Sequence, residues 1–271
     1  MRLFGGQFAF ILGGIVSFSP VVYSSFAYAQ QVSPIASTFT VRIDVSGGGN
    51  GSGVIIARDG NTYYVLTAWH VVSEPRPYTV YTQDSRAHVV DSSYVERLSN
   101  YDLAVLRFTS HNNYELASIS TERLVPRQPI HVSGWLNPLI EITNTSYQFI
   151  PGNLTGYADP PEEGGYSLIF QSSGFQGLSG GPILDAEHKV VGIIGRGARS
   201  LEEGLIGLYL GIPISAFMDS HYAQYVQASQ YVNPGQQSDG VYYPVQREPP
   251  RPSNPPNVHI PTQADPPQTS R

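Results

Sequence analysis

The sequence predicts an all-β protein of the barrel or sandwich type. Two observations carry this prediction. The chain holds 18 Tyr, 27 Gly and 22 Pro against 2 Met, and that balance is typical of strands and turns rather than of helical bundles. Short apolar runs also alternate with turn residues at near-regular spacing, which is the pattern of barrels and sandwiches. With 41% hydrophobic and 13% charged residues, a sizeable core is possible.

The N-terminal residues 1–29 predict an export signal. Arg2 gives a basic start, an uncharged apolar run extends from Leu3 to Val22, and Ala27-Tyr28-Ala29 fits the small-x-small cleavage pattern. An uncleaved membrane anchor is the alternative, because the run is long enough to span a bilayer. We expect cleavage, a periplasmic or extracellular protein, and no stable membrane association. The chain has no Cys, so its fold must rely on its core rather than on disulfides.

Two further segments are predicted to lie outside the folded unit. Residues 30–38 form a polar leader segment. Residues 233–271 hold 10 of the 22 prolines and few large aliphatic residues, so we expect a disordered tail that is a spacer or has no specific role, rather than a polyproline ligand. The net charge of -6 is spread along the chain without a Lys/Arg cluster, which argues against a nucleic-acid partner.

Residues 39–125 predict a first set of strands. The stretch Thr38–Val45 alternates apolar and polar residues with period two, as a half-buried strand does. The turn Asp59-Gly60-Asn61 joins two apolar runs into a hairpin. The other strands predicted here are Ser52–Ala57, Thr62–Ala68, Tyr78–Thr82, Ala87–Val90 and Leu103–Phe108.

Residues 126–232 predict a second set of strands and one helix. A proline-flanked junction at Pro126–Pro129 separates the two sets. Apolar residues at helical spacing after Pro213 predict a helix over Ile214–Ser229. The strands predicted here are Ile130–Gly134, Tyr147–Tyr157, Tyr166–Ser172, Pro182–Leu184, Lys189–Ile194 and Gly204–Ile212.

A glycine-rich turn, Phe175–Pro182, carries the first candidate catalytic residue, Ser179. Glycine permits positive φ and close approach of backbones, so such a turn can present a hydroxyl and aim its own N–H groups at one point. That geometry suits a serine nucleophile with an oxyanion hole. The motif alone is weak evidence, because glycine-rich turns around serine are common.

Two upstream stretches supply the residue types that a serine nucleophile needs. His70 follows the apolar strand that ends in Thr67-Ala68, and Asp102 precedes the strand Leu103–Phe108. Serine requires a base within hydrogen-bond reach, and imidazole titrates near neutral pH. A carboxylate on the other ring nitrogen fixes the tautomer. The order His, Asp, Ser therefore predicts a catalytic triad.

These motifs resemble those of the chymotrypsin-like (trypsin-fold) serine proteases. The stretches T-A-W-H, Y-D-L-A-V-L and G-L-S-G-G-P look most like bacterial members, including the protease domain of the HtrA/Deg family, although no PDZ domain follows. The resemblance implies two perpendicular six-stranded antiparallel β-barrels, over residues 39–125 and 126–232, with a closing C-terminal helix. It also implies a cleft between the barrels, peptide-bond hydrolysis, polypeptide substrates and no cofactor or metal.

The resemblance also assigns substrate-binding residues. Gly177 and Ser179 would donate backbone N–H groups to the oxyanion. Ser173 would form the floor of the primary specificity pocket, and Gly197 and Gly207 would leave its walls open. Gly195 and Arg196 would lie beside the substrate backbone. A neutral, open pocket predicts cleavage after large apolar or aromatic residues.

Two other classes of function stay open at this point. The stretch Gly177–Gly181 also satisfies G-x-S-x-G, the nucleophile elbow of α/β-hydrolase esterases, but the chain lacks the βαβ alternation of that fold. A catalytically retired binding module of trypsin fold is the second alternative, which the presence of all three triad residues disfavours. The six other histidines have no metal-ligand spacing, and the sequence leaves the oligomeric state open.

Overall fold

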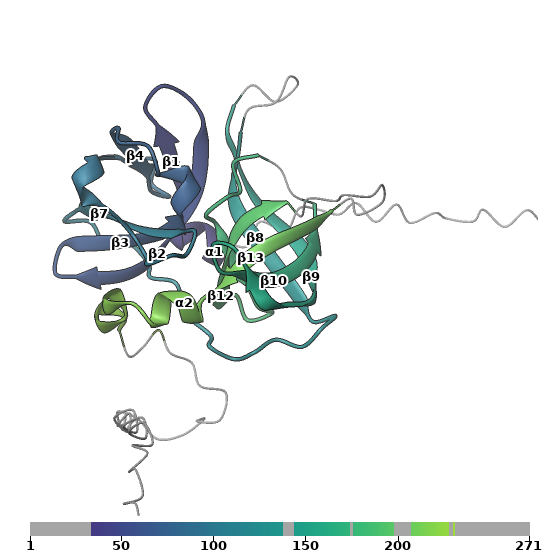
Figure 1. Cartoon of the computed structure of the whole chain (residues 1–271). Helices are drawn as coiled ribbons and strands as arrows, with labels where there is room; N and C mark the ends of the chain where they lie inside the picture. Colours follow the sequence, from purple (N-terminus) through teal and green to yellow (C-terminus); the bar gives the residue numbers. More distant parts are fainter. Residues whose placement is uncertain (1–33, 138–143, 174–175, 198–206, 228–229, 231–271) are drawn as a thin grey trace, which may run out of the picture. The chain divides into compact units, whose positions relative to one another are not determined.

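The strands form two antiparallel sheets, which Figure 1 shows as two groups of arrows. The structure is a computed structural model that describes residues 34–137, 144–173, 176–197, 207–227 and 230. The predicted signal peptide and proline-rich tail lie outside the described residues. The fold-class prediction is confirmed, since one sheet is a closed six-stranded barrel and the other is a curled sheet.

The first sheet has seven strands in the order β5-β4-β1-β2-β3-β7-β6. It has one strand more than predicted, because β6 pairs with β7. Glu96 and Arg97 of β6 are exposed, so the apolar pattern gave no signal for it. The strands are β1 (Thr40–Val45), β2 (Asn50–Asp59), β3 (Thr62–Ala68), β4 (Tyr78–Tyr81), β5 (Ala87–Val90), β6 (Val95–Arg97) and β7 (Leu103–Thr109).

The second sheet closes into a barrel in the order β10-β13-β12-β11-β8-β9. Closure satisfies the backbone of every strand and leaves no free edge. The strands are β8 (Pro129–Leu136), β9 (Ser146–Glu162), β10 (Tyr166–Ser172), β11 (Pro182–Leu184), β12 (Val190–Gly197) and β13 (Leu208–Pro213).

Helical segments are short in the described part of the chain, and the predicted helix over 214–229 is wrong. An α-helix, α2 (Ser215–Met218), ends before Ser220, whose φ of -85° and ψ of 162° are extended, and a 3₁₀ helix, η3 (His221–Tyr225), follows. This break lets Phe217 become fully buried while the Tyr222 ring packs 5.4 Å from that of Tyr64. None of the described helices is long and apolar enough to cross a membrane.

The end of the predicted leader is also helical. A six-residue helix, α1 (Pro34–Phe39), precedes β1, and its Ala36 and Phe39 are buried in the core. Its last turn therefore belongs to the folded unit. Two 3₁₀ helices, η1 (Trp69–Val71) and η2 (Ser92–Tyr94), connect strands of the first sheet.

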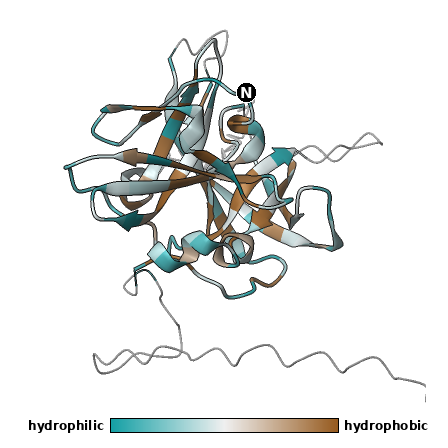
Figure 2. Cartoon of the chain, turned by 60° about the vertical axis from the view of Figure 1, so that its left-hand side comes forward, coloured by the Kyte–Doolittle hydropathy of each residue, from teal (hydrophilic) through white to brown (hydrophobic). Residues whose placement is uncertain are grey.

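The core consists of three clusters of buried apolar side chains. One fills the curl of the first sheet, one fills the barrel, and the third joins the outer faces of both to α2 and η3. Strand β2 is buried on both faces, since Ile55 belongs to the first cluster and Val54 and Ile56 to the third. Figure 2 shows the same distribution, with apolar strands and hydrophilic turns.

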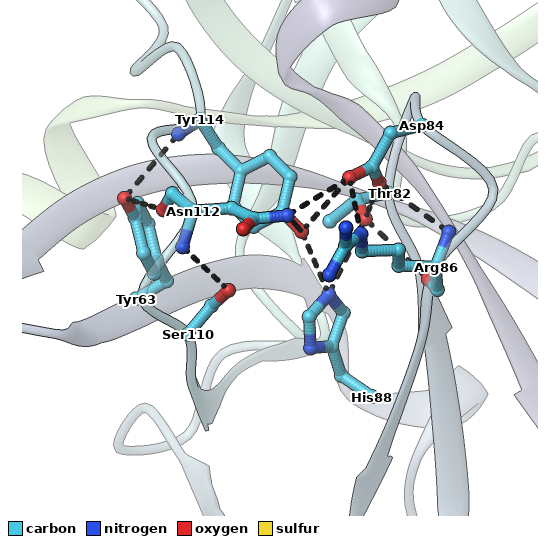
Figure 3. A network of polar contacts seen from close by, with 8 residues as sticks. All are labelled: Tyr63, Thr82, Asp84, Arg86, His88, Ser110, Asn112 and Tyr114. Carbon is cyan, nitrogen blue, oxygen red and sulfur yellow. Dashed lines mark hydrogen bonds and ion pairs between the residues drawn. The ribbon is translucent and has the colours of Figure 1, made fainter.

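A polar network at the edge of the first sheet involves the turn between β4 and β5 (Figure 3). The Asp84 carboxylate accepts hydrogen bonds from the Thr82 hydroxyl at 2.6 Å and the Asn112 amide at 3.2 Å. The Tyr114 hydroxyl also donates to Asp84, at 3.3 Å. These bonds lower the pKa of Asp84, although burial alone would raise it. The network ties the β4–β5 hairpin to the segment after β7.

A buried serine joins the two sheets beside the glycine-rich turn. The Ser52 hydroxyl donates to the carbonyl of Gly177 at 2.7 Å and accepts from the N–H of Trp135 at 2.8 Å. The Ser52 N–H donates to the carbonyl of Ser179 at 2.8 Å. Because these groups are buried and hydrogen-bonded across the joint, breaking any one of them leaves a costly unpaired partner. The position of the turn is therefore fixed relative to the first sheet.

Candidate active site

The pairing of β3 with β7 brings His70 and Asp102 together. Ala68 lies opposite Leu103 in this ladder, so η1 begins where β7 begins. The Nδ1 of His70 lies 2.7 Å from Oδ2 of Asp102, and the His70 backbone N–H donates to Oδ1 at 2.8 Å. Two bonds to one carboxylate fix both the ring and the backbone of His70. A carboxylate at Nδ1 leaves Nε2 as the free basic nitrogen.

The barrel also holds Asp102, through the β9–β10 hairpin. The Tyr166 hydroxyl, on β10, donates to Oδ2 of Asp102. The Asp102 backbone N–H donates to the carbonyl of Gly164 in the hairpin turn at 2.8 Å. The Tyr166 ring passes over Gly195, where a Cβ would lie 1.9 Å from Cε1 of the tyrosine. The lack of a side chain at position 195 therefore makes room for Tyr166.

Asp102 is ionised because its hydrogen bonds outweigh its burial. Burial by itself raises the pKa of a carboxyl group, but the bonds from the His70 ring and the Tyr166 hydroxyl stabilise the anion, and the pKa of Asp102 is lowered overall. Burial and the neighbouring carboxylate raise the pKa of Tyr166. Tyr166 thus keeps its proton and remains a donor to Asp102.

The turn before β11 presents Ser179 to a cavity that His70 also lines. Three backbone bonds hold the turn: Gly180 N–H donates to Ile194 at 2.8 Å, Gly181 N–H to Leu178 at 3.0 Å, and the Ser179 carbonyl accepts from Ser52. The Ser179 hydroxyl donates to the carbonyl of Gly195 at 3.1 Å. This hydrogen bond goes to Gly195 and not to His70. In enzymes without bound substrate, the hydrogen bond between nucleophile and base is often long or poorly aligned, and it tightens when substrate binds.

One hydrogen bond sets the orientation of the peptide between Gln176 and Gly177, the first of the two predicted oxyanion-hole residues. The Gln176 carbonyl accepts from the Asn137 N–H at 2.9 Å. In a trans peptide the N–H points away from the preceding carbonyl, so the Gly177 N–H faces the opposite side. Gly177 has φ +101°, and a Cβ there would lie 2.3 Å from the Trp135 carbonyl, so only glycine fits. Within the described residues, neither the Gly177 nor the Ser179 N–H has a backbone acceptor.

The cavity beside Ser179 has a volume of about 400 Å³ and an apolar wall. Of the residues that the resemblance assigned to substrate binding, Gly195, Arg196 and Gly197 line it. Ser173 is exposed and is not among the lining residues, whereas Ser172 is. The apolar lining consists of Val132, Phe170, Leu178, Ile194 and Tyr209.

Gly207 binds the backbone of Ser172, one of the residues that line the cavity. Its carbonyl accepts from the Ser172 N–H at 3.0 Å, and it does not line the cavity itself. In the described part of the chain, no three His, Asp or Glu side chains gather as a metal site needs.

Local sequence patterns do not mark Tyr166, which is predicted only as the first residue of an apolar strand. Its partner lies on the other sheet, so no local pattern marks it. The pair formed by Glu162 and Arg196, whose Oε2 and Nη2 lie 2.7 Å apart, was missed because the two residues lie on strands of the barrel, β9 and β12, that are far apart in the sequence. The neighbouring Gly195 was the available signal, because a glycine inside an apolar strand indicates close approach of another group.

We predict that Tyr166→Phe destabilises the fold in a pH-dependent way. The variant loses a hydrogen bond to a charged group, so the free energy of unfolding at pH 7 should fall by about 1.5–3 kcal/mol. The lowered pKa of Asp102 contributes stability above the unfolded value of about 3.9, and this contribution disappears as the pH falls through the folded value. The difference between variant and wild type should therefore shrink below about pH 4.

Tyr157→Phe is the matched control, measured by denaturant unfolding from pH 3 to 7. The Tyr157 hydroxyl donates to the neutral carbonyl of Leu124 at 3.0 Å, so its loss should cost about 1 kcal/mol at every pH in this range. A Tyr166→Phe deficit that stays constant with pH would contradict the assignment of Tyr166 as a donor to an ionised Asp102.

The sequence is similar to that of known peptidases. A family model described as a trypsin-like peptidase domain matches residues 51–193. Over 156 residues the chain is 28% identical to a protein named "Serine protease HtrA-like" from Staphylococcus aureus strain USA300, covering 53% of this chain and 20% of that protein. The same figures hold for strain NCTC 8325. The chain thus spans about a fifth of the length of these curated relatives.

Solved structures show the same fold. The Rv3671c protease from M. tuberculosis in its active form matches with a TM-score of 0.58 at 18% identity, covering 75% of this chain and 87% of that one. Its inactive form gives a TM-score of 0.54 at 18% identity, covering 70% and 90%. Because the family model takes in more than half of the residues, this chain belongs to the trypsin-like peptidase family.

Proposed function

We propose that the chain is an exported serine endopeptidase. The observation that carries the proposal is the 2.7 Å contact between His70 and Asp102 at a cavity that Ser179 also lines. An imidazole, a carboxylate and a hydroxyl are the three groups of a Ser-His-Asp catalytic triad. Membership of the trypsin-like peptidase family supports polypeptides as substrates. Export is proposed from the signal pattern of residues 1–29.

In the proposed mechanism, Nε2 of His70 takes the proton from the Ser179 hydroxyl as Oγ attacks the peptide carbonyl. Asp102, held by Tyr166, stabilises the imidazolium that forms. The N–H groups of Gly177 and Ser179 receive the developing oxyanion. His70 then protonates the leaving amine, and water attacks the acyl-enzyme by the same route.

The competing functions have less support. An α/β-hydrolase esterase needs a parallel sheet with crossover helices, and the named strands here pair antiparallel. Against a retired binding module stand the three hydrogen bonds that the Asp102 carboxylate accepts, two of them from His70, since this arrangement is what a working base requires. The geometry therefore favours an active enzyme.

The proposed function predicts a clear result with an activity-based probe. A fluorophosphonate should label the wild type and not Ser179→Ala, and only the wild type should cleave casein. Asp102→Asn should keep the fold but lower kcat by about 10⁴-fold, because the imidazole loses its tautomer and its counter-ion. Labelling without casein cleavage would indicate an esterase, and neither labelling nor cleavage would indicate a binding module.

We also propose cleavage after large apolar or aromatic residues. The support is the apolar wall of the cavity, in which Phe170 and Tyr209 stack with ring centroids 5.8 Å apart. Among the described lining residues there is no carboxylate to pair with Lys or Arg. Burying an apolar side chain there gains about 25 cal/mol per Å². A panel of peptide esters should show the highest kcat/KM for Phe, Tyr or Leu, and fastest turnover of Lys or Arg esters would overturn the preference.

A further inference from the structure

Among the described residues that line the cavity, Arg196 is the only Lys, Arg, Asp or Glu. It follows Gly195 on β12, and Gly195 accepts the hydrogen bond from Ser179. The Arg196 side chain is 33% exposed. Because Arg196 is the residue next to the one that contacts the Ser179 hydroxyl, its positive charge is within reach of a peptide bound at Ser179.

The guanidinium of Arg196 lies over an aromatic ring. Its Cζ lies 5.0 Å from the centre of the Tyr166 ring, whose hydroxyl binds Asp102. Stacking of this kind suits arginine, whose flat fork binds carboxylates through paired N–H groups. The guanidinium of Arg196 is therefore positioned to bind a carboxylate of the substrate.

One carboxylate already occupies part of this fork. Oε2 of Glu162, at the end of β9, lies 2.7 Å from Nη2 of Arg196. The Glu162 side chain is 49% exposed, and exposed ion pairs contribute little stability because water screens them. Glu162 does not line the cavity, whereas Arg196 does. A peptide carboxylate can thus displace Glu162 or share the fork with it.

We propose that Arg196 forms a subsite for an acidic side chain of the substrate, with Glu162 as its exchangeable internal partner. This inference rests on the proposed peptidase function and adds a second specificity element to it. The primary pocket selects an apolar residue at the scissile bond, and Arg196 selects Asp or Glu within about three residues of it. The ideal substrate then pairs an apolar side chain with a nearby acidic one.

The test compares peptides that differ by one isosteric replacement. Fluorogenic peptides with a common apolar residue at the scissile bond carry Glu or Gln at each neighbouring position in turn. For the full chain at pH 7.5, the Glu peptide should have about five- to twentyfold higher kcat/KM at one position, the size expected for a charge-assisted bond. The ratio should fall as salt is added.

Variants identify the side chain responsible. Arg196→Gln should bring the Glu/Gln ratio to about one, and Glu162→Gln should raise it above that of the wild type by removing the competing carboxylate. Arg123→Gln is the matched control, because the Arg123 guanidinium also lies over a tyrosine, Tyr157 at 4.1 Å, but outside the cavity. It should leave the ratio unchanged.

The outcomes separate this inference from the proposed function. A wild type that takes the fluorophosphonate label but shows a Glu/Gln ratio near one at every position would overturn the acidic subsite alone. If Arg196→Gln fails to fold, an unchanged ratio in Glu162→Gln would overturn it equally. No label and no hydrolysis of any peptide would overturn the peptidase function and this subsite with it.

Discussion

The candidate active site depends on one carboxylate that groups from both sheets hold by hydrogen bonds. Asp102 directly precedes β7 of the first sheet, and its carboxylate receives hydrogen bonds from the ring and backbone of His70. The barrel adds the Tyr166 hydroxyl and the carbonyl of Gly164, which accepts from the Asp102 N–H. Burial penalises a carboxylate, and these donors stabilise it. The ionised Asp102 therefore links the two sheets as well as orienting His70.

The second contact between the sheets fixes the other half of the site. Ser52 binds the carbonyl of Gly177 and the N–H of Trp135, and its own N–H binds the carbonyl of Ser179. His70 and Ser179 come from different sheets, so their separation depends on these two joints together. Tyr166 and Ser52, which take no part in the proposed chemistry, thus help to set the distance between the proposed catalytic groups.

Short motifs mark the proposed catalytic groups. His70 and Asp102 flank apolar strands, and Ser179 lies in a glycine-rich turn, so local patterns are enough to predict these three residues. Tyr166 and the Glu162–Arg196 pair depend on which hairpin reaches which strand, and local periodicity carries no such information. Ser173 illustrates the same limit: β10 ends at Ser172, so Phe170 and Ser172, on one face of the strand, line the cavity, while Ser173 lies just beyond the strand and is exposed.

A crystal structure of the protein after reaction with a small fluorophosphonate would test this account most directly. The account predicts phosphorus bonded to Oγ of Ser179, with the phosphoryl oxygen about 2.7–3.1 Å from the N–H groups of Gly177 and Ser179. His70 would still contact Asp102, and Tyr166 would still donate to the same carboxylate. An adduct whose phosphoryl oxygen points away from both N–H groups, or an Asp102 released by Tyr166, would contradict it.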